Sequence, residues 1–240
     1  REKSTKKRKS LGLRTARENL DDLVDPGSFL EFGAFAVAAQ RNRRDYEELQ
    51  LETSADGILT GFCNINEDDV GEDNSHAAAI IYDYSVLAGS QGFFHHQKLD
   101  RICEKAEEFS LPVVIFTEGG GGRPGDTDVT TQIAGLHIPS FSTWARLTGK
   151  CLKIAVNNGY CFAGNAVLFG CSDFMIATKQ SWIGMAGPAM IEGGGLGVYD
   201  PKEIGPAEEQ YKNGVLDYLA VDEKEATFIR IYHDGCTNCI

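Results

Sequence analysis

The chain has 240 residues, of which 42% are hydrophobic, and a formal net charge of −12. This length suffices for one substantial domain or two small ones, and the negative charge disfavours general nucleic-acid binding. No run approaches the ~18 to 20 apolar residues of a membrane span and no signal peptide opens the chain, so we expect no membrane association. Seven cysteines are scattered through apolar segments, which is typical of reduced thiols in the cytosol and not of a disulfide framework.

The first fifty residues read as a basic arm followed by two helices. Residues 1–10, REKSTKKRKS, have no apolar face, so we expect a solvated or partly disordered arm. A phosphate-contacting or partner-docking role is the alternative. Residues 15–24 predict a short helix, the Pro-Gly pair within 25–29 marks a turn, and 41–49 predict a second, polar helix.

Two β-rich runs follow, at 56–65 and 77–86. The acidic segment between them, NEDDVGEDNSH at 66–76, does not have the carboxylate spacing of an EF-hand calcium loop. We therefore interpret it as a solvated hairpin loop. Asp83, which lies in the second run, is expected to have a structural hydrogen-bonding role.

Strand and helix alternate from about residue 77 to residue 190, which favours a parallel sheet with crossover helices. The predicted helices lie at 95–109, 139–150, 161–172 and 221–232, and the predicted strands at 111–116, 151–160 and 173–178. His95 and His96 begin the first of these helices, and no neighbouring residue in the sequence completes a catalytic triad with them. We interpret both as surface residues of a helix start.

Four consecutive glycines, Gly119 to Gly122, come directly after a predicted strand. They lack the lysine and serine or threonine of a Walker loop, and Pro124 follows them where a dinucleotide-binding helix would open. An oxyanion site fits better, because bare backbone N–H groups at a strand end or in the first turn of a helix can point at a developing enolate oxygen. Two separated loops, EGGGG at 118–122 and CFAGNA at 161–166, suit this chemistry.

The second loop lies in a longer stretch that resembles a known family. Residues 157–178, NNGYCFAGNAVLFGCSDFMIAT, are similar to the crotonase superfamily segment N-G-Y-x-x-G-G-G-x-x-L-x-x-x-C-D-x-x-x-A. Four further segments, in order along residues 12–232, resemble the carboxyltransferase (β) subunits of biotin-dependent acyl-CoA carboxylases. They are TARENLDDLVDPGSFLEFG, YDYSVLAGSQGFFHHQKLDRI, TEGGGGRPGD and IGMAGPAMIEGGG.

This resemblance implies an α/β fold: a crotonase-like spiral of ββα units with a mainly parallel sheet. Residues 51–235 would be the N-terminal carboxyltransferase half, preceded by the arm and helices of 1–50 and followed by an atypical tail at 236–240. The implied reaction is transfer of a carboxyl group from carboxybiotin to the α-carbon of an acyl-CoA. The implied partners are a biotin carboxyl carrier protein or domain, biotin carboxylase and further copies of the chain.

The resemblance also implies site residues. Backbone N–H groups of three glycines would hold the enolate oxygen, namely Gly120, Gly121 and Gly164. The residues implied to bind substrate are Gly119, Gly122, Arg123, Ala163, Gly187 and Pro188, and no metal site is implied. The loop 184–195 would form part of the wall of an acyl-CoA or biotin channel. A structural ion pair is the preferred role for Arg123.

Several departures from the family pattern bear on the reaction. The two acid/base glutamates of crotonase-type hydratases fall at Val167 and Gly187 here, so hydration of an enoyl-CoA is disfavoured. Carboxyl transfer does not need them, because the resemblance implies that biotin's own ureido nitrogen takes the α-proton. Gly119 stands where the family usually has a serine.

The chain matches one of the two crotonase-like halves of such enzymes, and the resemblance places the active site between halves of two subunits. A biotin-dependent decarboxylase subunit and a non-catalytic acyl-CoA-binding half-domain therefore remain alternatives. The pair Cys236 and Cys239 lacks a second pair for zinc, and we interpret it as a fortuitous or appended tail. Cytosol is the expected compartment, with the mitochondrial matrix left open.

Overall fold

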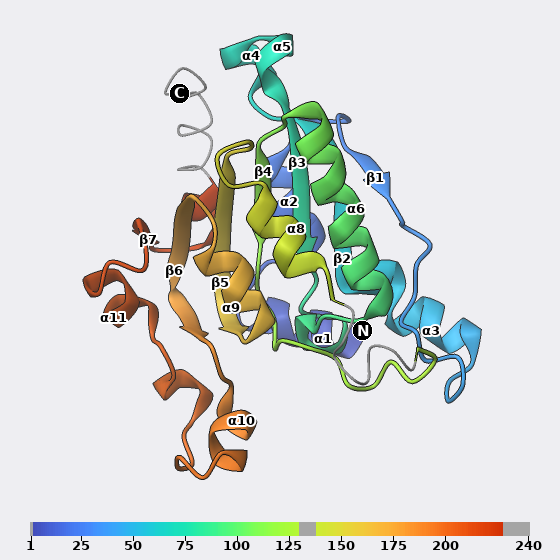
Figure 1. The fold of residues 1–240 in the computed structure, drawn as a ribbon, viewed down its shortest axis with the longest axis vertical. Coiled ribbons are helices and arrows are strands. Elements are labelled where there is room, and N and C mark those ends of the chain that lie inside the picture. Colours follow the sequence, from blue (N-terminus) through green and yellow to red (C-terminus); the bar gives the residue numbers. More distant parts are fainter. Residues whose placement is uncertain (1, 130–137, 228–240) are drawn as a thin grey trace.

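One mixed sheet organises the molecule (Figure 1). This computed structural model describes residues 2–129 and 138–227, and within them seven strands pair in chain order. The strands are β1 (Leu30–Phe32), β2 (Ile58–Asn64), β3 (His76–Tyr82), β4 (Val113–Phe116), β5 (Lys153–Phe162), β6 (Phe174–Gly184) and β7 (Tyr218–Ala220). The pairings among β1, β2 and β3 are antiparallel and those from β3 to β7 are parallel, which confirms the expected α/β fold with a mainly parallel sheet.

The hairpin of β2 and β3 confirms the interpretation of the acidic segment as a connection. Two short helical turns, α4 (Glu67–Val70) and α5 (Glu72–Ser75), replace the irregular loop that we expected. Most of their side chains are exposed, and the two turns stand at the end of the molecule away from the four glycines at 119–122 (Figure 1).

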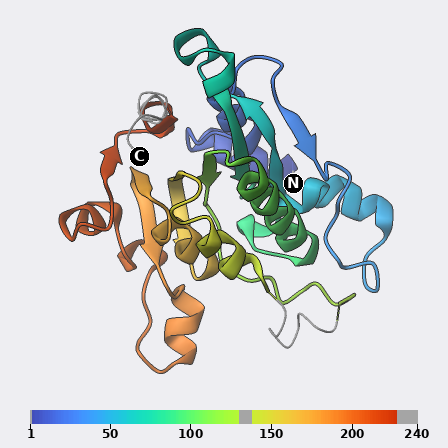
Figure 2. The same ribbon diagram turned by 45° about the horizontal axis from the view of Figure 1, so that its top comes forward.

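Helices cover both faces of the sheet. On one face lie α6 (Phe93–Phe109), α8 (Ser140–Arg146) and α9 (Gly164–Gly170), and on the other lies α2 (Ala16–Leu23) (Figures 1 and 2). Successive strand residues point to opposite faces, so Ile80 joins the core under α6 and Ile81 joins the core under α2. Because both faces are covered, β3 and β4 are apolar at almost every position.

The N-terminal segment differs from its prediction. Residues 2–10 form a helix, α1 (Glu2–Ser10), where we expected a solvated or partly disordered arm. Arg8 is buried, and its side chain donates to the carbonyl oxygen of Arg14 at 2.8 Å and forms an ion pair with Glu118. The partner lies 110 residues away in sequence, so periodicity within the segment gave no sign of it.

The remaining elements flank the sheet. They are α3 (Tyr46–Glu52), α10 (Pro188–Gly193) and α11 (Ala207–Lys212), with short 3₁₀ turns η1 (Ser54–Gly57), η2 (Leu87–Gly89) and η3 (Pro201–Glu203). Both views show α10 projecting beyond the sheet (Figure 2). Part of the helix predicted at 221–232 and the pair Cys236 and Cys239 lie outside the described residues. Within the described ranges, no helix is long and apolar enough to cross a bilayer.

Leu99 tests the packing of α6 on the sheet. Its side chain is fully buried in the main core, so Leu99→Ala is expected to lower the free energy of unfolding by roughly 2 to 5 kcal/mol. The matched control is Glu104→Ala, at an exposed position on the same helix. This substitution should change the free energy of unfolding by less than about 0.5 kcal/mol. Denaturant titration measures both, and equal effects would contradict the burial of α6.

Candidate active site

Two loops meet where the parallel strands β4 and β5 end. The glycine loop, residues 117–123, follows β4, and the first turn of α9 follows β5. The strand pairing continues into the glycine loop, because Gly119 N–H donates to Tyr160 O at 2.7 Å and Phe162 N–H donates to Gly119 O at 3.0 Å. The structure therefore brings together the two loops that the sequence singled out.

The close contact of the loops explains two of the glycines. A Cβ atom on Gly119 would overlap the Gly89 carbonyl oxygen and the Asn165 amide. Gly121 has φ +90°, and a Cβ there would lie 2.8 Å from the Cβ of Ala163 and 3.8 Å from Gly164 N. Positive φ costs glycine almost nothing, so the bare backbone lets the glycine loop lie directly on the start of α9.

The hydrogen bonds of the glycine loop decide which N–H groups can face a ligand. Gly120 N–H donates to Ala88 O at 3.1 Å and Gly121 N–H to Asn165 Oδ1 at 3.0 Å. Both were expected to face the enolate oxygen, and in this structure both hold the loop in shape instead. The N–H groups of Gly122 and Gly164 have no acceptor among the described residues, and Gly122 is exposed.

Gln91 joins Gly164 to the glycine loop. Its backbone N–H donates to Gly121 O at 2.8 Å and its carbonyl accepts from Arg123 N–H at 2.9 Å. Its side-chain amide donates to the hydroxyl of Tyr82 at 2.9 Å. A Cβ on Gly164 would overlap Gln91 Oε1, so position 164 must lack a side chain if Gln91 is to keep all these contacts.

Ala163 holds an unusual backbone conformation just before α9, with φ 53° and ψ −121°. Such angles are costly for a residue with a Cβ and cluster where a site dictates the backbone path. The family pattern has glycine at this position. Ala163 N–H donates to Gly184 O at 3.1 Å, which ties the turn to β6.

Arg123 closes the glycine loop through a buried ion pair with Asp56 Oδ1. The exposed fraction of the arginine side chain is 4% and that of the aspartate is 0%, and Asp126 lies 3.5 Å away on the other side. This confirms the structural interpretation of Arg123 and leaves its guanidinium no free surface for substrate. Burial raises the pKa of Asp56, and the charge of Arg123 opposes that rise.

His95 and His96 are buried, so their interpretation as surface residues was wrong. The backbone N–H of His95 donates to Asp56 Oδ2 at 2.8 Å, and His96 Nδ1 lies 2.8 Å from Ser140 Oγ. Burial lowers the pKa of His96 to about 4. The start of α6 faces the interior because the carboxylate of Asp56 caps it from another segment, a contact that helical periodicity does not predict.

Asp83 has the structural role expected of it. Its Oδ1 accepts hydrogen bonds from the backbone N–H of Ser85 at 2.9 Å and from its hydroxyl at 2.5 Å.

Glu118 lies directly before the glycines, and its side chain points to the opposite face of the sheet from α9. Its two oxygens accept from the guanidinium of Arg8 at 2.9 and 2.8 Å. Burial raises the pKa of Glu118 to about 7, against the lowering effect of the Arg8 charge. This carboxylate therefore anchors the glycine loop to α1 and is not directed at the N–H groups of Gly122 and Gly164.

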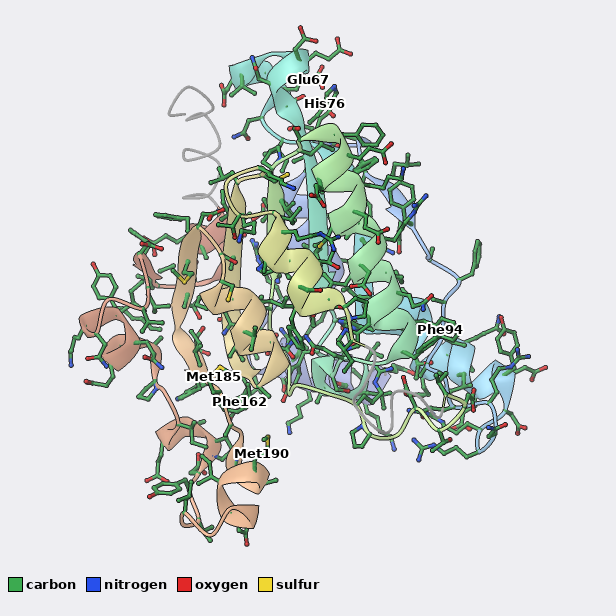
Figure 3. The ribbon with its side chains drawn as sticks, viewed as in Figure 1. Glu67, His76, Phe94, Phe162, Met185 and Met190 are labelled. Atoms are coloured by element: carbon green, nitrogen blue, oxygen red, sulfur yellow. The ribbon has the colours of Figure 1, made fainter. Side chains whose placement is uncertain are left out.

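Gly187 and Pro188 lie beside the end of β5. A Cβ on Gly187 would be 3.5 Å from the ring of Phe162, and Pro188 is the first residue of α10. Figure 3 shows Phe162 and Met185 near each other at this end of the sheet, with Met190 on α10 beyond them. The loop expected to form a channel wall is thus next to the first turn of α9.

Sequence analysis missed three residues that shape this site: Asn165, Gln91 and Asp56. All are polar and buried, and each bonds to segments distant in sequence. The sequence did contain one indication of the role of Asn165. It replaces the third glycine of the family pattern, so it adds a side chain at a position where the pattern has none.

A family model described as the carboxyl transferase domain matches residues 7–233. The chain belongs to the carboxyl transferase family. The match includes the glycine loop, the first turn of α9 and the loop before α10, so the two meeting loops are features of a carboxyl transferase domain.

Individual relatives agree with this assignment. The chain is 30% identical to the methylmalonyl-CoA carboxyltransferase 12S subunit of Propionibacterium freudenreichii subsp. shermanii, over 95% of this chain and 41% of that subunit. A solved single-chain, multi-domain long-chain acyl-CoA carboxylase superposes with TM-score 0.91 and 50% identity, over 97% of this chain and 23% of that one. Transcarboxylase 12S, solved as a hexamer with methylmalonyl-CoA bound, superposes with TM-score 0.79 and 28% identity, over 96% of this chain and 43% of that one. The carboxyl transferase chain described here thus spans about two fifths of the curated relative.

Glu118 gives a pH-dependent stability. Its pKa in the folded protein, about 7, exceeds the ordinary value of 4.5, so the folded state binds more protons than the unfolded state between these values. The free energy of unfolding should therefore fall as pH rises from about 4.5 to 7, by up to about 3 kcal/mol from this group. Glu118→Gln should remove that decline in urea titrations at a series of pH values.

The control for this titration is Glu104→Gln, an exposed glutamate that should leave the pH dependence as in the wild type. An unchanged slope in Glu118→Gln would show that Glu118 ionises as it does in the unfolded chain.

The Arg123–Asp56 pair predicts a large cost of removing one partner. Arg123→Met leaves the Asp56 carboxylate buried and unpaired, which should lower the free energy of unfolding by roughly 3 to 5 kcal/mol. Arg44→Met, which breaks the more exposed pair with Glu48, should cost at most about 1 kcal/mol. Similar costs in thermal unfolding would argue against a buried pair.

Proposed function

We propose that this chain binds the thioester of an acyl-CoA and stabilises its enolate during carboxyl transfer to the α-carbon. The observation that carries the proposal is the pair of N–H groups of Gly122 and Gly164, which have no acceptor among the described residues. They lie on two loops in contact at the carboxyl ends of β4 and β5. Gly122 faces open space, which leaves room for a flat thioester.

Loss of a proton from the α-carbon places negative charge on the thioester oxygen. Two N–H donors fixed in advance stabilise that charge more than they stabilise the neutral carbonyl, and one such donor is worth about 3 to 4 kcal/mol of transition-state stabilisation. Gly120 and Gly121 contribute indirectly, because their internal hydrogen bonds hold the loop that carries Gly122. We therefore assign the donor role to Gly122 and Gly164.

At the two positions where hydratases carry their acid/base glutamates, this protein has no side chain that could take the α-proton. Val167 lies on α9 and Gly187 at the start of α10, and neither can accept a proton. Glu118 is paired with Arg8 on the other face. Carboxybiotin, delivered by a carrier, would supply both the carboxyl group and, after its release, a ureido nitrogen as base. The loop at Gly187 and Pro188, beside Phe162, is the part of this chain that would border it.

The complete enzyme would need further parts. Because the chain spans about two fifths of the curated relative, we propose that a second crotonase-like half, a biotin carboxyl carrier and biotin carboxylase complete the reaction. The hexamer of the transcarboxylase 12S relative supports assembly into oligomers. The described cysteines are free thiols, namely Cys63, Cys103, Cys151, Cys161 and Cys171. Free thiols support a reducing compartment such as the cytoplasm or the mitochondrial matrix.

Gly164→Ala tests the proposed site. The added Cβ would displace Gln91 and with it the glycine loop, so propionyl-CoA affinity measured by calorimetry should fall roughly 10- to 100-fold. Carboxyl transfer from methylmalonyl-CoA to free biotin, where the chain supports it, should fall at least as much. The matched control is Gly170→Ala on the same helix, where an added Cβ meets nothing within 4 Å.

The two measurements separate the alternatives. Binding without transfer would identify the chain as the acyl-CoA-binding half of an active site. Equal affinity in Gly164→Ala and the wild type would remove Gly164 from the site, and no binding to the wild type would leave only the fold in common with the family.

A further inference from the structure

The side chain of Asn165 connects three segments around the candidate site. Its Nδ2 donates to Thr117 O at 3.0 Å and lies 3.5 Å from Gly89 O, and its Oδ1 accepts from Gly121 N–H at 3.0 Å. These contacts join α9 to two points of the glycine loop, Thr117 and Gly121, and to the η2 turn at Gly89. The side chain is completely buried, so no solvent competes for the bonds.

Only a carboxamide of this length satisfies all three backbone groups. The Gly121 N–H needs an acceptor while Thr117 O and Gly89 O need donors, and this also fixes which end of the amide faces which partner. An aspartate would accept from Gly121 but repel the two carbonyl oxygens. An aliphatic side chain would leave buried polar groups without partners, which is costly.

Asn165 follows one proposed ligand-facing donor in the chain and is hydrogen-bonded to the residue that precedes the other. Gly164 precedes Asn165 on α9. Gly121, whose N–H donates a hydrogen bond to Asn165 Oδ1, precedes Gly122. The Asn165 side chain therefore links α9, which carries Gly164, to the part of the glycine loop that carries Gly122. Movement of the glycine loop away from α9 would have to break the bond between Gly121 N and Asn165 Oδ1.

We propose that Asn165 is a positioning residue that sets the distance between the N–H groups of Gly122 and Gly164. It does not touch the substrate, because it is buried beneath the contact of the two loops. This inference rests on the proposed function, since the spacing matters only if both N–H groups bind one thioester oxygen. It predicts an effect on the acyl thioester that is absent from CoA alone.

The experiment compares propionyl-CoA with CoA, which lacks the thioester carbonyl, by calorimetry on the 240-residue chain. The wild type should bind propionyl-CoA more tightly than CoA. Asn165→Ala should reduce that ratio of affinities about tenfold while leaving CoA affinity nearly unchanged. Amide hydrogen exchange across residues 119–122 should become faster, because Gly121 N–H loses its acceptor.

The matched control is Asn19→Ala. Asn19 is also a buried asparagine, and its amide donates to Glu223 Oε1 at 3.1 Å on the α2 face of the sheet. This variant should lose stability without a change in the affinity ratio or in loop exchange. If Asn165→Ala does not fold, Asn165→Ser serves, because its side chain is neutral and too short to reach Gly121 N–H and the carbonyl oxygens of Thr117 and Gly89 together. Its affinity ratio should fall in the same direction.

The outcomes distinguish the two levels of the argument. A wild-type preference for propionyl-CoA that survives in Asn165→Ala or Asn165→Ser would overturn the positioning role and leave the proposed function standing. Equal losses for propionyl-CoA and CoA would show a purely structural role and would also overturn it. No binding of either ligand by the wild type would overturn the proposed function, and the role of Asn165 toward a thioester with it.

Discussion

The pairing of β4 with β5 beyond the regular strands is the constraint on which the rest of the site depends. Gly119 exchanges hydrogen bonds with Tyr160 and Phe162, so the chain leaving β4 cannot turn away from β5. The next residues are then forced against the first turn of α9. A backbone that must pass this close to another backbone has no room for side chains, and this is the physical reason for the glycines at 119 and 121.

Two buried ion pairs hold the ends of the glycine loop. Arg8 from α1 pairs with Glu118 before the glycines, and Arg123 after them pairs with Asp56. Such pairs add little net stability, because the loss of hydration offsets most of the attraction between the charges. Their consequence here is geometric: each fixes one end of the loop to a different element. The same carboxylate of Asp56 also accepts from the N–H of His95 in the first turn of α6, so the loop and that helix share an anchor.

The proposed carboxyl transfer, in preference to hydration, rests on what this arrangement offers. Backbone donors are present at the loop contact, while the two hydratase glutamate positions hold Val167 and Gly187. Under the proposed function, such a site would stabilise an enolate and take its proton acceptor from elsewhere. Membership of the carboxyl transferase family, shown over residues 7–233, agrees with that division of roles.

Local patterns predicted what depends on neighbouring residues in the chain. Alternation of apolar runs with helical periodicity predicted the β2–β3 hairpin, α6 and the parallel strands. The glycine cluster at a strand end predicted one of the two loops of the candidate site. Arg123 was recognised as an ion-pair residue, although its partner was not. The errors share one cause. Residues 1–10 were expected to form a solvated or partly disordered arm, and His95 and His96 to be surface residues, because their partners Glu118, Asp56 and Ser140 are distant in sequence.

The sequence by itself thus determined the fold class, the family and the two loops that carry the candidate site. Only the tertiary structure decided which N–H groups in those loops remain available. Every glycine N–H is an equal donor in the sequence, and its role depends on whether an acceptor such as Ala88 O or Asn165 Oδ1 lies within reach. Those acceptors come from segments far apart in the chain, and their positions are set by the packing of β3, β4 and α9 as a whole.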